Sequence, residues 1–599
     1  MRTTSFKTKI SMAVLAIGIL FISSCKKYFD TQSTSSLTYA QVFDNVPDAQ
    51  KAVFGVYQDL AGDYGYGLNL SLYYCYDDDN MMGPLGNGDG SKKDMTHYVI
   101  TSGTQASVLD YPFNQLYQGI ERANNCIYYL PTMPDFNNPS SSNQAELHRL
   151  YGEALTLRAQ YYFDLVKIWG DVPAQYLPSA ETTDFYVPAT NRDSIYDHIL
   201  SDLQVAENMM PWYWQLPGND GRLTQNAARG LRARIALFRG GWSLRADGTM
   251  QRGSNWQTYY QIAKAECDTV ISTGQNSLNN SYQAIFKNGL CLGVYEPKEV
   301  LFQIGAAPGS ATGGDSKLGI YDGPKSTVGG ATAGSSGVLL LPTYFYTFDS
   351  TDVRRDVTCA PYTVGLSGTG TVLLTATKIT GLSTGKFRRD WVPNGAGATG
   401  QYLSEAWPLI RYSDILLMDA EADNALNGAP SQTDITNLQL VQARAHGNNL
   451  GLVPPAPTDQ VGFFNAIMKE RGLEFGGEGL RKYDLIRWDS LASKIAATKI
   501  NLVGFSTKTG FFNGYDLSKL PTSMYWSNTP TGGIQWNNSF YVKPATTPPG
   551  TSASWLGSGA ASFLTYYATG FVTGQSELYP FANAVIAANS KILQNPNYH

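Results

Sequence analysis

The segment GEALTLRAQYYFDLVKIWGDVP, from Gly152 to Pro173, does most to decide the fold of this chain. Its apolar residues recur at spacings of three and four, which is the period that places side chains on one face of an α-helix. Gly170 and Pro173 end the pattern. The segment therefore predicts a half-buried helix whose inner face carries Ala154, Leu157, Tyr161, Leu165 and Ile168.

Helical patterns continue on both sides of this segment. Asn191 and Thr224 are the expected N-caps of two later helices, because their side-chain oxygens can accept a free backbone N–H. Helices of this size, joined by short turns, suggest an array of α-hairpins, although no fixed-period repeat is present. The further helices expected in the first half are residues 47–60, 191–210, 224–240 and 256–273.

The chain becomes rich in Gly, Ser and Thr after about residue 275, with short β-like runs such as Thr371 to Thr375. Such long loops in a compact protein are usually functional or mobile. Helical patterns then return, so helices far apart in sequence must pack together around the loops. The loop-rich stretches are 306–337, 361–400 and 505–575, and the later helices are Trp407 to Asn427, Asp434 to Ala445 and Phe463 to about Ile495.

These patterns predict one large, mainly α domain with an irregular, loop-rich subdomain that contains short β-hairpins. The domain is expected to span residues 25–599, after a signal peptide at 1–24. Its helical parts are predicted at about 40–275 and 405–495. Its loop-rich side is predicted at about 73–113, 276–404 and 500–580.

The N-terminus has the features of an export signal. Arg2, Lys7 and Lys9 precede an apolar run from Ile10 to Ile22, which suits a signal peptide but is short for a transmembrane helix. The stretch Ile22-Ser23-Ser24-Cys25 resembles a bacterial lipobox. This resemblance implies cleavage before Cys25 and a lipid on its thiol. The alternative is an ordinary secretory signal with an incidental cysteine.

Composition excludes some classes of function. Of the 599 residues, 43% are hydrophobic, which is typical of a globular protein, and the net charge of −5 with no basic patch argues against nucleic-acid binding. No HExxH zinc motif occurs. The remaining cysteines, with no CxxC pair, are predicted to be buried free thiols: Cys75, Cys126, Cys267, Cys291 and Cys359.

Several segments together resemble the SusD/RagB family, in that family's order. The most specific is Gly152 to Pro173, with its Gly-Glu-Ala, Leu-Arg-Ala, Tyr-Phe-Asp-Leu and Gly-Asp-Val-Pro elements. Their charged residues are expected to form buried ion pairs and helix-end contacts, among them Arg158, Arg222, Glu421, Glu470, Glu474, Glu478 and Arg481. The other matching segments are Leu116 to Pro131, Gly221 to Phe238, Glu299 to Gln303, Ile410 to Ala422, Lys469 to Trp488 and Gln594 to Tyr598.

The resemblance implies a fold and a function. The fold would combine tetratricopeptide-like helix pairs with a loop-rich ligand side. The protein would be a lipid-anchored outer-membrane protein, exposed on the cell surface and not an enzyme. It would capture an oligosaccharide and deliver it to a SusC-like TonB-dependent transporter. A structural lid for a non-glycan nutrient such as peptide, and a lipid-anchored glycoside hydrolase, are the alternatives.

Aromatic residues in loops are the best candidates for sugar contacts, since sugar C–H faces stack on aromatic rings while sugar hydroxyls need polar partners. In the family the ligand face is built from loops that correspond here to about 73–113 and 306–346. The loopy C-terminal stretch supplies a second group. The candidate ligand-binding residues are Tyr76, Asp77, Asp78, Asn80, Tyr98, Tyr111 and Tyr321, with Trp526 and Trp536 as the second group.

The acidic run Asp77-Asp78-Asp79-Asn80 leaves several interpretations open. It could hydrogen-bond a sugar, supply a glycosidase acid pair, bind Ca²⁺ or form a solvated loop. A glycosidase needs two carboxyl groups at a set separation across the bond, and adjacent residues tend to point apart. Calcium needs six to eight oxygen ligands, which loop carbonyls would have to complete. Neither a cofactor nor a metal is expected.

Overall fold

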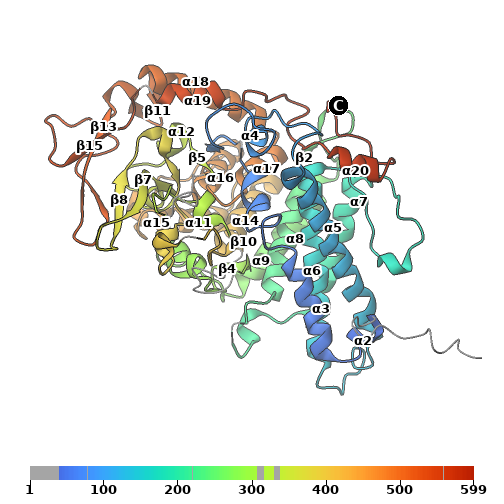
Figure 1. Cartoon of the computed structure of the whole chain (residues 1–599). Helices are drawn as coiled ribbons and strands as arrows, with labels where there is room; N and C mark the ends of the chain where they lie inside the picture. Colours follow the sequence, from blue (N-terminus) through green and yellow to red (C-terminus); the bar gives the residue numbers. More distant parts are fainter. Residues whose placement is uncertain are drawn as a thin grey trace, which may run out of the picture.

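The computed structural model describes residues 39–598 except for residues 77, 219, 306–315, 329–336, 399 and 558. The predicted signal peptide, the lipid attachment at Cys25 and the candidate Asp77 therefore lie outside the described residues. The protein is mainly α, as predicted. The long helices of the first half, coloured blue to green, lie on the right of Figure 1, and shorter helices, short strands and loops lie on the left.

The helices of the first half agree well with the sequence patterns. The side chain of Asn191 caps α7 by accepting the backbone N–H of Asp193, as predicted. Thr224 does not cap α8 in this way, because its hydroxyl donates to the side chain of Asn226 instead. These helices are α2 Tyr39–Val42, α3 Val46–Gln58, α4 Lys92–Thr96, α5 Ala106–Tyr129, α6 Gln144–Trp169, α7 Arg192–Met209, α8 Gln225–Arg239 and α9 Trp256–Ser272.

The later helices are shorter and differ more from the prediction. The stretch expected as one helix from Phe463 to Ile495 is three helices, because Gly477, Gly479 and Asp489 have positive φ angles that end a helix. The helices are α10 Tyr282–Ala284, α11 Leu318–Tyr321, α12 Pro342–Phe345, α13 Arg354–Thr358, α14 Tyr412–Asn427, α15 Gln432–Ala445, α16 Gln460–Glu474, α17 Arg481–Arg487, α18 Leu491–Thr507, α19 Ala560–Tyr566 and α20 Asn583–Ala588.

The strands form small separate sheets, with orders β1-β5-β9-β6, β10-β4, β11-β12, β14-β13-β15, β2-β3 and β7-β8. The predicted helix at Trp407 begins instead as strand β10, which pairs with β4. The strands are β1 Met81–Met82, β2 Trp242–Leu244, β3 Met250–Arg252, β4 Val300–Ile304, β5 Leu339–Leu340, β6 Cys359–Ala360, β7 Tyr362–Leu366, β8 Val372–Ala376, β9 Ser383–Thr384, β10 Trp407–Arg411, β11 Phe511–Phe512, β12 Tyr515–Asp516, β13 Ser523–Asn528, β14 Ile534–Trp536 and β15 Thr551–Ser554.

The long helices pack as one continuous series. Each of α5 to α9 packs on the next, and α9 then packs on α14, which packs on α15 and α16. The series thus skips the loop-rich residues between α9 and α14, as the sequence predicted for helices far apart in the chain. One main hydrophobic core contains residues from Phe43 to Ile592. All five described cysteines are free and buried, as predicted.

Helix α6 is the centre of the helical half. The sequence predicted that one face would be buried, but almost all of its residues from Gly152 to Trp169 are buried. The reason is that α3, α5, α7 and α8 all pack against it. Its charged residues are paired inside the protein, for example Arg158 with Asp202 at 2.8 Å. A helix that is surrounded on all sides needs such pairs, because a lone buried charge is costly.

The charged residues of the segments that resemble the SusD/RagB family form buried ion pairs, as predicted. Arg411, at the end of β10, lies 2.7 Å from carboxylate oxygens of both Glu474 and Glu478. Glu474 also pairs with Arg444 and Arg354. The other predicted residues are paired as Arg222–Glu153, Arg487–Glu421, Arg354–Glu470 and Arg481–Asp79.

Candidate functional site

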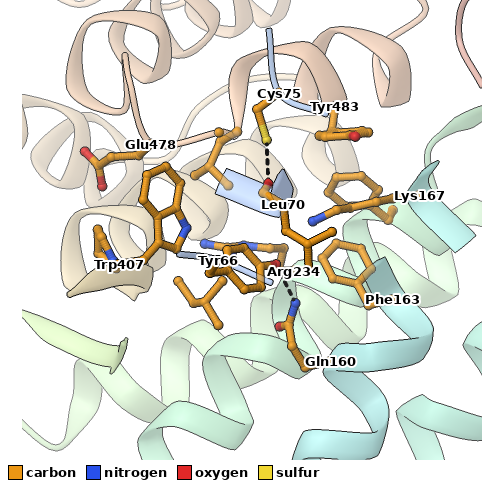
Figure 2. Close-up of a pocket in the computed structure, with 15 residues that line it drawn as sticks. Tyr66, Leu70, Cys75, Gln160, Phe163, Lys167, Arg234, Trp407, Glu478 and Tyr483 are labelled. Atoms are coloured by element: carbon orange, nitrogen blue, oxygen red, sulfur yellow. Dashed lines mark hydrogen bonds between the residues drawn. The ribbon is translucent and has the colours of Figure 1, made fainter. Parts of the chain in front are cut away.

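An interior void lies where α6 and α8 meet the segment from Tyr66 to Cys75 (Figure 2). Figure 2 shows the rings of Tyr66, Phe163 and Trp407 around it, with Gln160 donating to the Tyr66 hydroxyl and the Cys75 thiol donating to the Leu70 carbonyl. Its volume of about 20 Å³ has room for roughly one water molecule. The void is therefore a packing feature of the core and too small for a sugar.

Most candidate residues near the acidic run are buried. Tyr76 is 1% exposed, and Tyr98 packs its ring edge-on against Phe571 with the amine of Lys482 over its face. Asp78 is also 1% exposed, and one of its oxygens accepts the backbone N–H groups of Asn80 and Met81. These three side chains therefore do not present a surface to a ligand.

The rest of the acidic run also has structural partners. Asp79 makes a bidentate ion pair with Arg481, with both N–O distances at 2.7 Å. Burial and the neighbouring Asp79 raise the pKa of Asp78, although backbone N–H groups and Arg481 oppose this. Asn80 is buried as well, and its carbonyl accepts the N–H of Leu341. Among the described residues, no group of three or more His, Cys, Asp or Glu side chains could hold a metal ion.

Trp526 and Trp536 lie together in a different part of the molecule. They are cross-strand partners on β13 and β14. Trp526 is buried, and Trp536 packs against Phe540 at 4.9 Å between ring centroids. Figure 1 places the β13 and β15 strands of this sheet at the far left, apart from α4 and α11. The structure therefore does not bring the tryptophan pair together with the other candidates.

Tyr111 and Tyr321 do lie at a surface that the fold assembles. We call it the tyrosine surface and define it by eight residues from the loop before Asn69, from α4, α5 and α11, and from the loop before β10. Tyr111 and Tyr402 are 45% and 41% exposed, and the other members are half-buried. The members are Asp63, Tyr64, Lys92, Tyr111, Lys317, Tyr321, Gln401 and Tyr402.

Lys317 holds two of these loops together. Its amine donates to a carboxylate oxygen of Asp63 at 2.6 Å and lies 4.7 Å from the ring centroid of Tyr402. The Tyr402 hydroxyl donates to the same oxygen of Asp63 at 3.2 Å. Burial lowers the pKa of Lys317, but its hydrogen bonds to Asp63 and Tyr402 outweigh this and leave it above its usual value. The lysine therefore stays charged and fixes the Tyr402 ring.

Tyr321 continues this surface at the end of α11. The amine of Lys92 lies 5.3 Å from its ring centroid, and Gln401 donates to its hydroxyl at 3.4 Å. Tyr73 lies buried near Tyr321 and Asp63. Burial raises the pKa of Tyr73, and the nearby Tyr321 and Asp63 raise it further. On the side of α5, Tyr111 packs edge-on against Tyr64 at 5.2 Å.

The tyrosine surface offers flat aromatic faces beside charged and amide groups. Such a combination suits a ligand that has both C–H faces and hydroxyl groups. Sequence reasoning found Tyr111 and Tyr321 but missed the other six members. Tyr402 and Asp63 are 339 residues apart in the chain, and no local pattern marks either one. The only signal in the sequence was that both lie in or near loops.

Two family models match the chain. One is described as "SusD family" and matches residues 343–598, and the other is described as "Starch-binding associating with outer membrane" and matches residues 27–237. The chain belongs to the SusD family. The second description places proteins of this kind at the outer membrane. Of the helices that the structure describes, none combines the length and the apolar character needed to cross a bilayer.

Other SusD proteins resemble this chain along most of its length. A SusD-like protein of Formosa agariphila is 25% identical over 520 residues, which cover 81% of this chain and 90% of the relative. A solved SusD homolog from Bacteroides thetaiotaomicron has a TM-score of 0.73 at 20% identity and covers 94% of this chain and 99% of its own. These likenesses establish the SusD fold, in agreement with the resemblance in the sequence.

Two further solved SusD-type structures carry descriptions of ligands. A laminarin-binding SusD-like protein has a TM-score of 0.62 at 20% identity and covers 92% of this chain and 99% of its own. Surface glycan-binding protein A from Bacteroides thetaiotaomicron, solved in complex with laminarihexaose, has a TM-score of 0.61 at 19% identity with the same coverage. The ligands named are those of these two proteins.

Proposed function

We propose that the protein binds an oligosaccharide at the tyrosine surface and delivers it to a TonB-dependent transporter of the outer membrane. The observation that carries the proposal is the arrangement around Tyr402. Its exposed ring is fixed by the Lys317–Asp63 pair, so a flat apolar face and charged hydrogen-bonding groups lie side by side. A sugar ring needs both kinds of partner.

The relatives support the glycan part of this proposal. The descriptions of two structures with the same fold name laminarin and laminarihexaose as ligands of those proteins. Which glycan this chain binds is a separate question, because the identity to them is only about one residue in five. Delivery to a SusC-like transporter, the lipid at Cys25 and exposure on the cell surface follow from the resemblance in the sequence and belong to the same proposal.

Binding without catalysis is part of the proposal. Asp79 is paired with Arg481. Asp78 is buried in the protein, and its carboxyl group accepts hydrogen bonds from two backbone N–H groups. A glycosidase would need two carboxyl groups presented to opposite sides of one bond. The tyrosine surface contains a single carboxylate, Asp63, which is already paired with Lys317. The proposed function requires no cofactor.

A binding screen tests the proposal. Purified protein would be run through native gels that contain plant, fungal or host polysaccharides, and each polysaccharide would be checked afterwards for breakdown products. We expect retardation by one class of glycan and no breakdown. Breakdown of the retarding glycan would favour the glycoside hydrolase alternative. Retardation by no polysaccharide would contradict the proposal and favour a lid for a nutrient such as peptide.

A further inference from the structure

A second cleft lies on elements that do not contribute to the tyrosine surface. It is formed by α12, α16, α17 and α18 together with Asp79 and Asn80, and its volume is about 490 Å³. Small-molecule sites in proteins commonly have volumes of roughly 300–1,000 Å³. The cleft is therefore large enough for a mono- or disaccharide. In Figure 1 α18 runs along the top of the molecule, whereas α11 of the tyrosine surface lies near the centre.

Two buried polar groups at this cleft lack partners among the described residues. Asn80 is 7% exposed and Thr343 is 3% exposed, and both side chains line the cleft. The Asn80 amide nitrogen and the Thr343 hydroxyl make no hydrogen bond within the described part of the chain. Buried polar groups in native proteins nearly always have a partner. A small shift of each side chain toward the cleft would let the hydroxyl groups of a ligand supply these partners.

The charges at the cleft are unbalanced. Arg481 and Asp79 neutralise each other through their bidentate pair. Lys469 on α16 and Lys494 on α18 also line the cleft, and neither forms an ion pair with a carboxylate among the described residues. The Lys469 amine donates a hydrogen bond to the side-chain oxygen of Asn513 at 3.4 Å. The lining therefore carries one lysine on α16 and one on α18 that no carboxylate of the described residues pairs with.

We propose that this cleft is a second binding site, for a saccharide that carries at least one anionic group. The anionic group would lie between the amines of Lys469 and Lys494, because charge-assisted hydrogen bonds are stronger than neutral ones. The hydroxyl groups would meet Asn80, Thr343 and Asn501. The half-buried ring of Phe512, which also lines the cleft, would take a C–H face of the sugar. This site adds to the one in the proposed function and shares no residue with it.

Calorimetric titration of the purified protein with three saccharides tests the proposal. The probes are digalacturonate, the neutral disaccharide galactobiose and galactose 6-sulfate. We expect digalacturonate to bind and galactobiose to bind at least tenfold more weakly. Binding of galactose 6-sulfate in preference to digalacturonate would identify a sulfate instead of a carboxylate as the anionic group of the same site. Equal binding of the charged and neutral disaccharides, or binding of no probe, would overturn the proposal.

Substitutions in the cleft test whether the acidic sugar binds there. Lys469→Met combined with Lys494→Met should raise the dissociation constant for the acidic sugar about tenfold or more. A matched control, Lys378→Met with Lys543→Met, removes two exposed lysines away from the cleft and should leave it unchanged. Unchanged affinity in the cleft variant would overturn the proposal. Thr343→Val, which removes only a hydroxyl, should also weaken binding. Neither result depends on the polysaccharide screen, because the two sites share no lining residue.

Discussion

The amine of Lys317 lies 2.6 Å from a carboxylate oxygen of Asp63, a residue 254 positions earlier in the chain. This pair connects the loop before Asn69 to the start of α11, and Tyr402 donates to the same oxygen. The two side chains are 13% and 32% exposed. A partly exposed pair of this kind contributes little to overall stability but can fix the local geometry of a surface.

We expect Lys317→Met and Asp63→Asn each to weaken glycan binding several-fold, because either change frees the Tyr402 ring. The loss of unfolding free energy should be about 1 kcal/mol or less. The double variant should bind the glycan with the same affinity as the single variant that binds it more weakly, because each single change already removes the same interaction. Calorimetric titration with the glycan that retards the protein in native gels measures these affinities. Fully additive losses in the double variant would show that the two residues act separately.

Arg411 gives a prediction about stability. It lies buried among carboxylates, and Arg411→Met would leave Glu474 and Glu478 with fewer positive partners. Removing one member of a buried ion pair costs about 3–5 kcal/mol. We expect a loss of that size in chemical unfolding. Lys51→Met is the control, because Lys51 is 76% exposed and pairs with Asp48 on the surface, where we expect about 1 kcal/mol or less. Equal losses in the two variants would contradict this account of the network.

Glu405 gives a prediction about pH. Burial raises its pKa from 4.5 to about 8, although backbone N–H groups and Arg389 oppose this. Between these two pH values the folded protein holds a proton that the unfolded chain has released. Stability should therefore fall as pH rises through this window, at up to about 1.4 kcal/mol per pH unit.

Glu405→Gln cannot ionise and should escape this loss. The stability of the variant relative to the wild type should rise by on the order of 2–3 kcal/mol between pH 5 and pH 8. Chemical unfolding at the two pH values measures the change. Glu181→Gln, at an exposed position, should show no such trend. The free energies of unfolding of Glu405→Gln and the wild type could instead differ by the same amount at both pH values. That result would contradict a raised pKa for Glu405.

The lipid anchor is tested at Cys25. Changing Cys25 to Ala removes the thiol that the lipobox-like sequence predicts as the attachment site. We expect the variant to leave the membrane fraction and appear among the soluble proteins after cell fractionation. Cys126→Ala, which alters a buried cysteine on α5, should stay with the membrane. A Cys25→Ala protein that remains membrane-bound would contradict the lipoprotein prediction.

The sequence predicted local structure better than long-range contacts. The 3.6-residue period from Gly152 to Trp169 identified α6, and Asn191 identified the start of α7, because both depend on neighbours in sequence. The acidic run was harder to interpret, since its partner Arg481 lies 402 residues away from Asp79. The same limit applies to Tyr402 and Asp63, whose roles arise only when two distant loops meet.

The most direct test of the proposed function is the affinity of Tyr321→Ala and Tyr402→Ala for the glycan that retards the wild-type protein. Tyr186→Ala is the control, because Tyr186 is 59% exposed and lies outside the tyrosine surface. We predict that calorimetry will show about a tenfold loss of affinity or more for each of the two variants, equivalent to about 1.4 kcal/mol, and none for the control. Wild-type affinity in both Tyr321→Ala and Tyr402→Ala would contradict binding at the tyrosine surface.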